Sequence, residues 1–452
     1  MLCACGGCKG PVSQDEPQQE QPVTEQVDLS LIKQSVPVTD DWVWSGKPDI
    51  TIHIENGNAV AVKVGVSVRY AKDNKEKVET VTDSVEVPAN GAIDYKATTT
   101  TMLNPGVYRA GCYVNNKVAR NFNFAIDPFS IKSEPDKQPD FDEFWQNAKE
   151  QLAGVEMNAT LTELPEKSST IRKVYLVEMY SVPDDPSGEP VKIRGYYCEP
   201  QDGQKHPVIM HYYGYDTQGS TAKCECPSGG SSKYAEFYLS HRGQYLNNRP
   251  ASTGNPGVTE DCVSYYGDWF SYNFGNRDTW YYRGAYMDVV QSVRFMATRE
   301  TSDMTKLFGE GSSQGGALTY AAAALSDYPF SAIACNVAFL GDFADAMDGI
   351  GGLAMELTKG ARGSMSNEEV LRFLSYFDTK NLATHISCAV LASSGLQDDV
   401  CPPRTNIVPF NNIAVAEADK EYVFGPEMGH DYPKNWNSKM WELFNKLNQK
   451  YE

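Results

Sequence analysis

The sequence lacks clustered cations, long apolar runs and abundant histidine. Its 40 lysines and arginines are outnumbered by 59 aspartates and glutamates, which gives a net charge of −19, and no block is rich in Lys and Arg. A surface that follows a nucleic-acid backbone needs clustered cations, so we expect no nucleic-acid partner. No stretch approaches the roughly 20 apolar residues of a membrane-spanning helix. With 452 residues, 41% of them hydrophobic and 11% aromatic, the chain has the material for the cores of two domains.

The first 27 residues do not have the composition of a folded domain. Leu2-Cys3-Ala4-Cys5 resembles the end of a bacterial lipoprotein signal, where a leucine and a small residue precede the lipidated cysteine. The basic and apolar regions of such a signal are missing, so we expect the true translation start to lie upstream of Met1. Residues 9–26 are rich in Pro, Gln, Glu and Ser, which predicts a disordered tether. Residues 1–27 are thus interpreted as a signal remnant and tether, and they predict a lipoprotein of the cell envelope or periplasm with a lipid anchor on Cys5.

The cysteines leave other interpretations open. If Cys3, Cys5 and Cys8 do not belong to a lipoprotein signal, they are either incidental or metal ligands, although the segment lacks a second ligand pair. The chain has 11 cysteines, an odd number, so at least one is unpaired in any disulfide scheme. Cys224, Cys226 and Cys262 are close enough along the chain to suggest one loop bridge, which the sequence does not assign.

A period of two dominates residues 28–127. Residues 60–68 place a valine at every second position, which puts the valines on one face of a strand. Further runs of this kind lie at 51–55, 78–87, 92–98, 107–114 and 118–126. Asn115-Asn116 between the last two runs is typical of a hairpin tip. This spacing predicts an immunoglobulin-like β-sandwich over residues 28–127, in which Trp42 and Trp44 are expected to pack in a core or against another domain rather than to stack on a sugar.

From residue 128 to residue 452 strands and helices alternate. The pattern predicts strands at 174–180, 191–197, 206–212, 333–338, 389–394 and 420–424. It predicts helices at 141–152, 287–297 and 437–449, with Asp140 as the cap of the first. Alternating β and α segments indicate a largely parallel sheet with helices on both faces.

The motif Gly311-Ser312-Ser313-Gln314-Gly315 lies where a short apolar strand gives way to strong helix formers. A serine hydroxyl is a weak nucleophile unless the chain raises it on a tight turn beside a base. Glycines at both ends of G-x-S-x-G allow that turn, because a side chain at either position would collide with the neighbouring strand or helix. The motif in this context predicts a nucleophile elbow at Ser313 and therefore a serine hydrolase.

Ser313 needs a histidine base and an acid, which in α/β-hydrolases follow the serine in the order acid, then histidine. Of the six histidines, only His385 and His430 follow Ser313. His385 precedes an expected strand and would lie at the wrong end of the sheet. His430 directly follows the strand expected at 420–424, and the glycine before it lets the loop turn the imidazole inward. We therefore interpret His430 as the base.

The acid and the oxyanion donors come from two further loops. Asp398 and Asp399 both follow an expected strand, and because adjacent side chains point in different directions only one of them can meet the imidazole. The spacing leaves the choice between them open. The main-chain N–H groups of Gln314 and of Tyr215, in the loop after an earlier strand, are expected to form the oxyanion hole. His211, on that earlier strand, is expected to be structural.

These residues and several further motifs resemble the acetyl xylan esterase and cephalosporin C deacetylase family, which is carbohydrate esterase family seven of the α/β-hydrolase superfamily. The matching segments run in order along about residues 140–446. They are Gly214-Tyr215, Arg242-Gly243-Gln244, Asp278-Thr279-Trp280-Tyr281-Tyr282-Arg283-Gly284, Gly311-Ser312-Ser313-Gln314-Gly315-Gly316, Leu374-Ser375-Tyr376-Phe377-Asp378, Gly395-Leu396-Gln397-Asp398, Pro402-Pro403 and Gly429-His430.

The resemblance implies an α/β-hydrolase domain over residues 128–452, with a mostly parallel, doubly wound sheet. It implies a catalytic triad of Ser313, Asp398 and His430, and oxyanion donors at Tyr215 and Gln314. It also implies that Arg242-Gly243-Gln244 is a structural motif near the site, and that the reaction needs no metal or organic cofactor. The family's shorter members assemble into closed hexamers; the added β-sandwich sets this chain apart from them, so the resemblance is compatible with a homo-oligomer but does not imply the hexamer.

Three features depart from the family pattern. Asp431 stands where Glu is usual, and Ser312 replaces the more frequent glycine; neither is expected to touch a catalytic group directly. The segment 245–276 is longer than usual and is rich in aromatic residues. These are Tyr265, Tyr266, Trp269, Phe270, Tyr272 and Phe274. They either line a substrate cleft or form a packed surface lobe.

Together these features predict a serine esterase that removes O-acetyl groups from acetylated xylo-oligosaccharides and related small acetyl esters. A thioesterase or peptidase of the same fold would share the triad. A surface glycan-binding protein with a vestigial hydrolase domain would not need all three triad residues. Because every candidate catalytic residue lies beyond Pro128, the sandwich is predicted to be separable from the chemistry.

Overall fold

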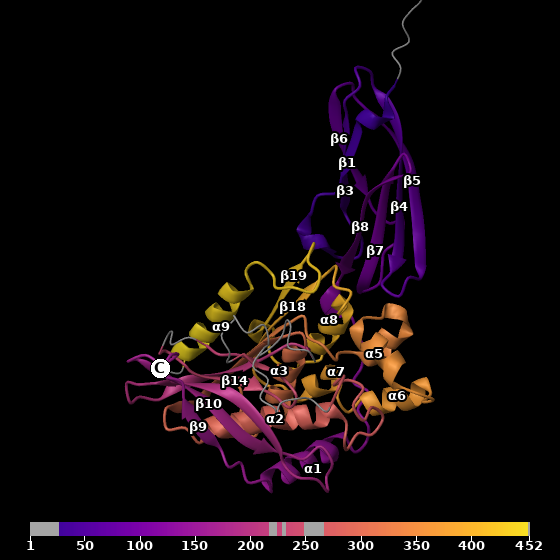
Figure 1. The fold of residues 1–452 in the computed structure, drawn as a ribbon. Coiled ribbons are helices and arrows are strands. Elements are labelled where there is room, and N and C mark those ends of the chain that lie inside the picture. Colours follow the sequence, from indigo (N-terminus) through magenta and orange to yellow (C-terminus); the bar gives the residue numbers. More distant parts are fainter. Residues whose placement is uncertain (1–26, 217–223, 228–231, 248–265, 451–452) are drawn as a thin grey trace, which may run out of the picture.

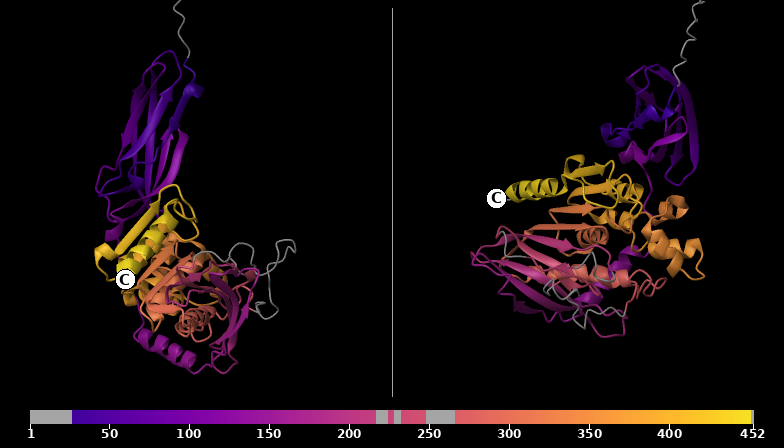
Figure 2. Two further views of the ribbon diagram at one scale, coloured as in Figure 1. Left: turned by 90° about the vertical axis from the view of Figure 1, so that its left-hand side faces the viewer. Right: turned by 45° about the horizontal axis from the view of Figure 1, so that its top comes forward.

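The computed structural model describes residues 27–216, 224–227, 232–247 and 266–450. Within these residues the chain forms an all-β region that is followed by a mixed α/β region (Figure 1). Two further views show the all-β region at the end of the α/β region that is formed by the C-terminal part of the chain (Figure 2). The predicted order of an all-β part and an α/β part is confirmed.

The all-β region consists of a three-stranded and a five-stranded sheet. The first has the order β1 (Ile32–Ser35), β3 (Ile50–Asn56) and β6 (Gly91–Ala97). The second has the order β2 (Val43–Trp44), β8 (Lys117–Ile126), β7 (Gly106–Val114), β4 (Val62–Lys72) and β5 (Lys77–Val87). Neighbouring strands are antiparallel except for β2 and β8, which are parallel. The expected strands are present, and the immunoglobulin-like assignment stays a prediction.

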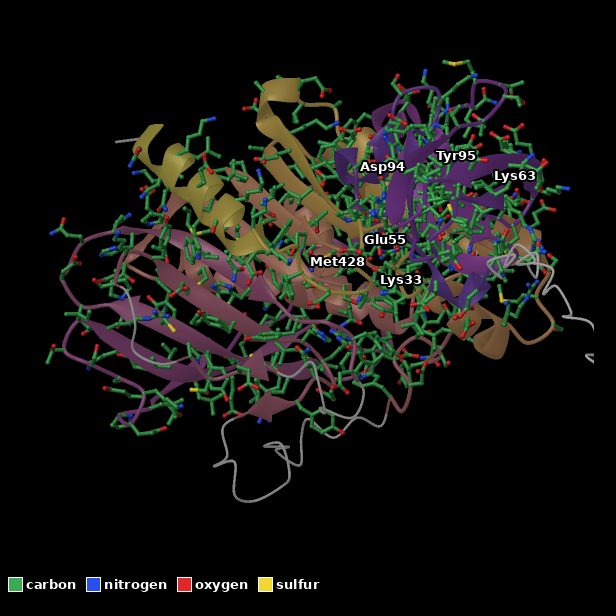
Figure 3. The ribbon with its side chains drawn as sticks, turned by 90° about the horizontal axis from the view of Figure 1, so that it is seen from above. Lys33, Glu55, Lys63, Asp94, Tyr95 and Met428 are labelled. Carbon is green, nitrogen blue, oxygen red and sulfur yellow. The ribbon has the colours of Figure 1, made fainter. Side chains whose placement is uncertain are left out.

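Alternate side chains fill the core of the all-β region. Ile52, Ile54 and Val64 are fully buried there. Glu55 and Lys63, one residue along from Ile54 and Val64, are exposed, and both are labelled in Figure 3. The period of two in the sequence therefore separates a core face from a solvent face, as a half-buried strand requires.

Two sequence expectations for this region are confirmed. Trp42 and Trp44 are 1% and 8% exposed and belong to the core of the all-β region, so they pack rather than present a sugar platform. Asn115 and Asn116 have φ angles of 46° and 62° between β7 and β8. Two consecutive left-handed residues are the conformation of a tight hairpin turn, and asparagine tolerates it better than most residues.

The α/β region is built on a nine-stranded sheet. Its order is β19 (Lys420–Gly425), β18 (Ala389–Gly395), β17 (Ala332–Asn336), β16 (Ser302–Ser312), β12 (His206–Tyr212), β14 (Ala235–Ser240), β11 (Val191–Pro200), β10 (Arg172–Ser181) and β9 (Thr160–Glu163). The strands from β19 to β14 in this order are parallel, and the remaining neighbours are antiparallel. A separate short pair is formed by β13 (Cys224–Glu225) and β15 (Leu246–Asn247).

Helices cover both faces of this sheet, as predicted. The helices are α1 (Phe141–Ala153), α2 (Tyr281–Ala297), α3 (Gln314–Leu325), α4 (Phe343–Asp345), α5 (Leu353–Ala361), α6 (Asn367–Leu374), α7 (Thr379–Leu382), α8 (Pro403–Asn411) and α9 (Trp436–Lys450). In β12, Val208 and Met210 pack in one core with α1, α2 and α3, whereas Ile209 packs in another with α9. No helix of the described part of the chain is long and apolar enough to span a membrane.

The prediction that the Asp140 side chain caps α1 is wrong. Asp140 stands at the N-cap position, but its side chain makes no capping hydrogen bond. Its carboxylate instead accepts hydrogen bonds from the Tyr376 hydroxyl and from the Arg277 guanidinium, which both belong to distant segments. A cap is a local interaction, and here tertiary partners that carry a charge or a hydroxyl compete successfully for the same oxygens.

Candidate active site

The predicted strand-to-helix turn is present at Ser313, between β16 and α3. Ser313 has φ 59° and ψ −122°, a combination that a residue with a side chain seldom adopts. A Cβ on Gly311 would lie 2.3 Å from the carbonyl oxygen of Gly315, and a Cβ on Gly315 would lie 2.2 Å from that of Tyr212. Only glycine fits at either position, so the two glycines of the motif are what lets the turn close.

Ser313, His430 and Asp398 form one chain of hydrogen bonds. The Ser313 Oγ lies 2.9 Å from Nε2 of His430, and Nδ1 of His430 lies 2.8 Å from Oδ2 of Asp398. The Asp398 side chain is fully buried, and the His430 side chain is 25% exposed. The three residues follow β16, β19 and β18 respectively, so the parallel strands bring their carboxyl ends together at one edge of the sheet.

The structure distinguishes the two adjacent aspartates. The second carboxylate oxygen of Asp398 accepts the main-chain N–H groups of Val400 and Cys401 at 2.8 and 2.9 Å, which holds the side chain against the imidazole. Asp399 is exposed to solvent. The geometry therefore places Asp398, and not Asp399, beside His430.

The loop that carries Tyr215 lies against the start of α3. Gly315 packs against the main chain of Tyr212 and Tyr213, just before Tyr215. The Tyr215 ring also lies near that of Phe339, with 6.1 Å between the ring centroids, and the Phe339 main-chain N–H donates to the Ser313 carbonyl at 2.9 Å. Gln314 is the first residue of α3, so its N–H has no acceptor within the helix and is free for a ligand.

Two residues that the sequence interpretation missed hold the Gln314 side chain. The Tyr282 hydroxyl donates to Oε1 of Gln314 at 2.7 Å, and Nε2 of Gln314 lies 3.0 Å from Nε2 of His241. Burial lowers the pKa of His241 to about 4, so this imidazole is neutral near pH 7 and its Nε2 accepts the amide hydrogen. Tyr282 lies within a motif that carries the resemblance, but no local pattern connects either residue with Gln314.

Arg242 links two segments near the site through buried hydrogen bonds. It is 1% exposed, and its guanidinium donates to both oxygens of Asp288 in α2 and to Asp184 after β10. Nearby, Nε2 of Gln244 reaches the carbonyl oxygen of Gly214, next to Tyr215, at 3.4 Å. Bidentate contacts of this kind fix orientation as well as position, which suits a structural motif beside a reactive loop.

Two of the three departures from the family pattern, Ser312 and Asp431, share a hydrogen-bond partner in Asn336. Nδ2 of Asn336 donates to the Ser312 hydroxyl at 2.7 Å and to the Asp431 carbonyl at 3.2 Å. Oδ1 of Asn336 accepts a hydrogen bond from the Ser393 hydroxyl. Asn336 therefore connects the residue before Ser313 with the residue after His430, a link that the sequence interpretation did not foresee.

Part of the aromatic segment is packed. Trp269 and Phe270 are fully buried, and Trp269 contacts the Tyr215 ring edge-on with 5.3 Å between centroids. This supports the packed interpretation over an open cleft for the described part of the segment.

Tyr265 lies outside the described residues, as do Cys5 and Cys262, so the expected lipid site and loop bridge stay predictions. Among the residues that the structure describes, no group of three or more His, Cys, Asp or Glu side chains is arranged to hold a metal ion.

Comparison with known proteins gives a consistent set of relatives. The family model described as acetyl xylan esterase (AXE1) matches residues 124–447. The acetyl esterase Axe7A of Xylanibacter ruminicola is 22% identical over 435 residues, which cover 91% of this chain and 92% of Axe7A. The solved acetyl xylan esterase from Paenibacillus sp. R4 has a TM-score of 0.57 and 25% identity, and the match covers 71% of this chain and 98% of that one. Acetyl xylan esterase 1 from Thermoanaerobacterium sp. JW/SL YS485 also has a TM-score of 0.57, with 23% identity over 71% of this chain and 97% of that one.

Proposed function

The chain belongs to the acetyl xylan esterase family, and on that premise we propose that it removes O-acetyl groups from acetylated xylo-oligosaccharides through an acyl-enzyme on Ser313. It is a carboxylic ester hydrolase that acts on acetyl esters. The observation that carries the mechanism is the hydrogen-bonded chain from Ser313 through His430 to Asp398. No separate observation favours a thioesterase, a peptidase or a vestigial domain.

In the first step, Nε2 of His430 accepts the Ser313 proton while Oγ attacks the carbonyl carbon of the acetyl group. The 2.9 Å separation of these atoms is within the range for such a transfer. Asp398 accepts the Nδ1–H of His430, which selects the tautomer whose Nε2 is free and stabilises the imidazolium that forms. The buried carboxylate thus acts on the base, not on the ester.

The negative charge that develops on the carbonyl oxygen needs donors that are already in place. The main-chain N–H groups of Gln314 and Tyr215 would supply them, because both lie in the two segments that meet beside Ser313. One such donor is typically worth about 10²- to 10³-fold in kcat. As the bond between the acetyl carbon and the sugar oxygen breaks, His430 gives its proton to that oxygen, so the sugar leaves as a free hydroxyl and the acetyl group stays on Ser313. Water, activated by His430, releases acetate in the second step.

A panel of esters tests the proposal. We expect acetylated xylo-oligosaccharides and p-nitrophenyl acetate to be hydrolysed. The family resemblance implies a small acyl pocket, so hydrolysis of the p-nitrophenyl butyrate and octanoate esters should be slower by roughly tenfold or more. One poorly fitting methylene costs about 1 to 3 kcal/mol in the transition state, which corresponds to at least about tenfold in rate. An acyl-CoA and a peptide serve as controls for the other reactions of this fold. Equal rates on acetyl and octanoyl esters, or a Ser313→Ala variant with wild-type turnover, would contradict the proposal.

A further inference from the structure

The segment just before Asp398 is anchored in the all-β region. Leu396 is fully buried and belongs to the hydrophobic core of that region, although it directly follows β18 of the α/β sheet. Figure 1 shows the same arrangement, with the lower end of the all-β region beside β18 and β19. A second contact between the regions is the ion pair of Arg120 with Glu427, in which the nitrogen and oxygen are 2.7 Å apart.

Asn123 of β8 makes the polar part of this contact. Its main-chain N–H donates to Oε1 of Gln397 at 2.8 Å, and its carbonyl accepts from Nε2 of Gln397 at 3.0 Å. Its side chain donates from Nδ2 to the Leu396 carbonyl at 2.9 Å. These hydrogen bonds join residues that are more than 270 positions apart in the sequence.

The edge of β8 explains why a glutamine fits there. β2 pairs with β8 only at Ala125 and Ile126, and main-chain groups two residues apart on a strand point to the same edge. The main-chain N–H and C=O of Asn123 therefore lie on the same edge of β8 as the groups that pair with β2 two residues later. The primary amide of Gln397 offers one acceptor and two donors, so it satisfies both groups as a strand residue would.

Gln397 also reaches the loop of the catalytic histidine. Its Nε2 donates to the Pro426 carbonyl at 2.7 Å, and its main-chain N–H donates to the Met428 carbonyl at 2.9 Å. One side chain thus joins β8, the acid loop and the histidine loop. The 2.8 Å hydrogen bond between Asp398 and His430 depends on the relative position of those two loops.

We propose that Asn123 and Gln397 are positioning residues for the catalytic acid, and that the all-β region is part of the active-site scaffold. The proposal rests on the proposed function, because it assigns Asp398 and His430 their roles. It replaces the expectation that the sandwich is separable from the chemistry. Removal of the all-β region would expose Leu396 to water and leave the Gln397 amide without its partner on β8.

The test uses the full chain with single substitutions. Gln397→Met keeps the length of the side chain and removes its hydrogen bonds, whereas Asn123→Ala removes only the bond to the Leu396 carbonyl. We expect kcat on p-nitrophenyl acetate to fall by roughly tenfold or more for Gln397→Met and by about threefold for Asn123→Ala, with little change in KM, because small misplacements of a catalytic group reduce the rate steeply. Asn121→Ala, on the same strand and exposed, is the matched control and should behave as wild type.

Two further readouts separate positioning from a loss of stability. The first is the pH profile of kcat/KM, whose acidic limb reports the protonation of the essential base in the free enzyme. A displaced Asp398 stabilises the imidazolium less, so this limb should move to lower pH in Gln397→Met. The second is the rate at which a p-nitrophenyl alkylphosphonate modifies Ser313, normalised to the number of reactive serines. This rate should fall in parallel with kcat.

The outcomes separate the two hypotheses. If Gln397→Met lowers only the unfolding temperature, and keeps the wild-type phosphonylation rate and pH profile, the contact is merely structural and the positioning proposal is wrong. If the wild type is phosphonylated rapidly but does not hydrolyse acetyl esters, the proposed function is wrong. A slower phosphonylation of Gln397→Met in that same case would still support positioning.

Discussion

Gly395 lies so close to Gly429 that a Cβ on Gly395 would be 2.2 Å from the Gly429 carbonyl oxygen. Gly395 ends β18 and begins the loop of Asp398, and Gly429 directly precedes His430. The loops that carry the acid and the base therefore approach as closely as two main chains allow. Any side chain at position 395 has to push them apart.

Gly395→Ala should consequently impair catalysis more than it impairs folding. We expect kcat to fall by about 10²-fold with KM changed little, because a displacement of the order of 1 Å has effects of this size. Gly360→Ala in α5 is the control, since a Cβ there meets nothing within 4 Å and alanine is the better helix former. Steady-state kinetics and thermal unfolding of both variants give the comparison. A folded Gly395→Ala protein with wild-type kcat would contradict this prediction, because the two loops could then move apart without loss of activity.

Asp398 and Asp399 should respond very differently to replacement by asparagine. In Asp398→Asn, the remaining oxygen would stay with the N–H groups of Val400 and Cys401, so the amide would turn its donor toward His430 and favour the wrong tautomer. We expect a loss in kcat of at least about 10²-fold. Asp399→Asn should stay within a few-fold of wild type, because that side chain is exposed. Ser313→Ala defines the floor of the assay, and the reverse ranking would overturn the assignment of the acid.

Tyr282→Phe should reduce kcat through Gln314. The variant leaves the buried Oε1 of Gln314 without its donor, so α3 should hold the oxyanion N–H less firmly, and we expect a fall of about threefold to tenfold. Tyr286→Phe, one turn along α2, is a matched control because its hydroxyl is also buried and donates to the Phe377 carbonyl at 3.0 Å. Both variants should lose about 1 kcal/mol of unfolding free energy. Only Tyr282→Phe should lose turnover; equal kinetics in both would contradict a role for Tyr282.

Because of His211, the free energy of unfolding should fall as the pH rises from 6.5 to about 9. Burial by itself would lower its pKa, but hydrogen bonds with Glu236 and Glu310 outweigh burial and raise the pKa from the ordinary value of 6.5 to about 9. Between these two values the folded protein holds a proton that the unfolded chain has released. The stabilisation of the folded protein by charged His211 is therefore complete below pH 6.5 and is lost as the pH rises toward 9.

Chemical unfolding at pH 6 to 9.5 measures this effect. The free energy of unfolding of the wild type should decline across that range, and the decline should be smaller in His211→Gln, which keeps polarity but has no titrating proton. A wild-type stability that is flat between pH 6.5 and 9, or a His211→Gln variant with the same slope, would show that His211 is not charged in the folded protein.

Cys5 should carry lipid in the native host. The pattern Leu2-Cys3-Ala4-Cys5 followed by a polar, proline-rich tether motivates this prediction. Mass spectrometry of the protein purified from membranes should find an N-terminal cysteine with acyl chains, and Cys5→Ser should move the protein to the soluble fraction. A native protein with an unmodified Met1 would refute it.

Local sequence signals were sufficient for the parts of the protein that depend on neighbouring residues. The valines of 60–68 predicted a strand with one buried face, and Asn115-Asn116 predicted the hairpin tip, because side-chain period and left-handed tolerance are properties of a few consecutive residues. The same holds for the turn at Ser313. Its glycines are required by contacts within the motif and with the adjacent strand.

The sequence order also placed the base of the triad. Parallel strands bring their carboxyl ends to one edge of the sheet, so a serine, an acid and a histidine after successive strands can be expected to meet there. The spacing alone left Asp398 and Asp399 undecided, because consecutive residues differ only in where their side chains point. The family resemblance implied Asp398, and the burial of its carboxylate against His430 is a tertiary property.

What only the tertiary structure decided is which distant polar groups became partners. Asp140 was expected to cap α1 and instead binds Tyr376 and Arg277. Gln397 and Asn123 show no periodicity or motif that connects them, and they meet because the packing of Leu396 into the all-β core brings the acid loop to the part of the β8 edge that lies beyond its pairing with β2. A sequence pattern reports which face of an element is buried, but a hydrogen bond between residues hundreds of positions apart exists only once the packed elements have set the distance and direction between donor and acceptor.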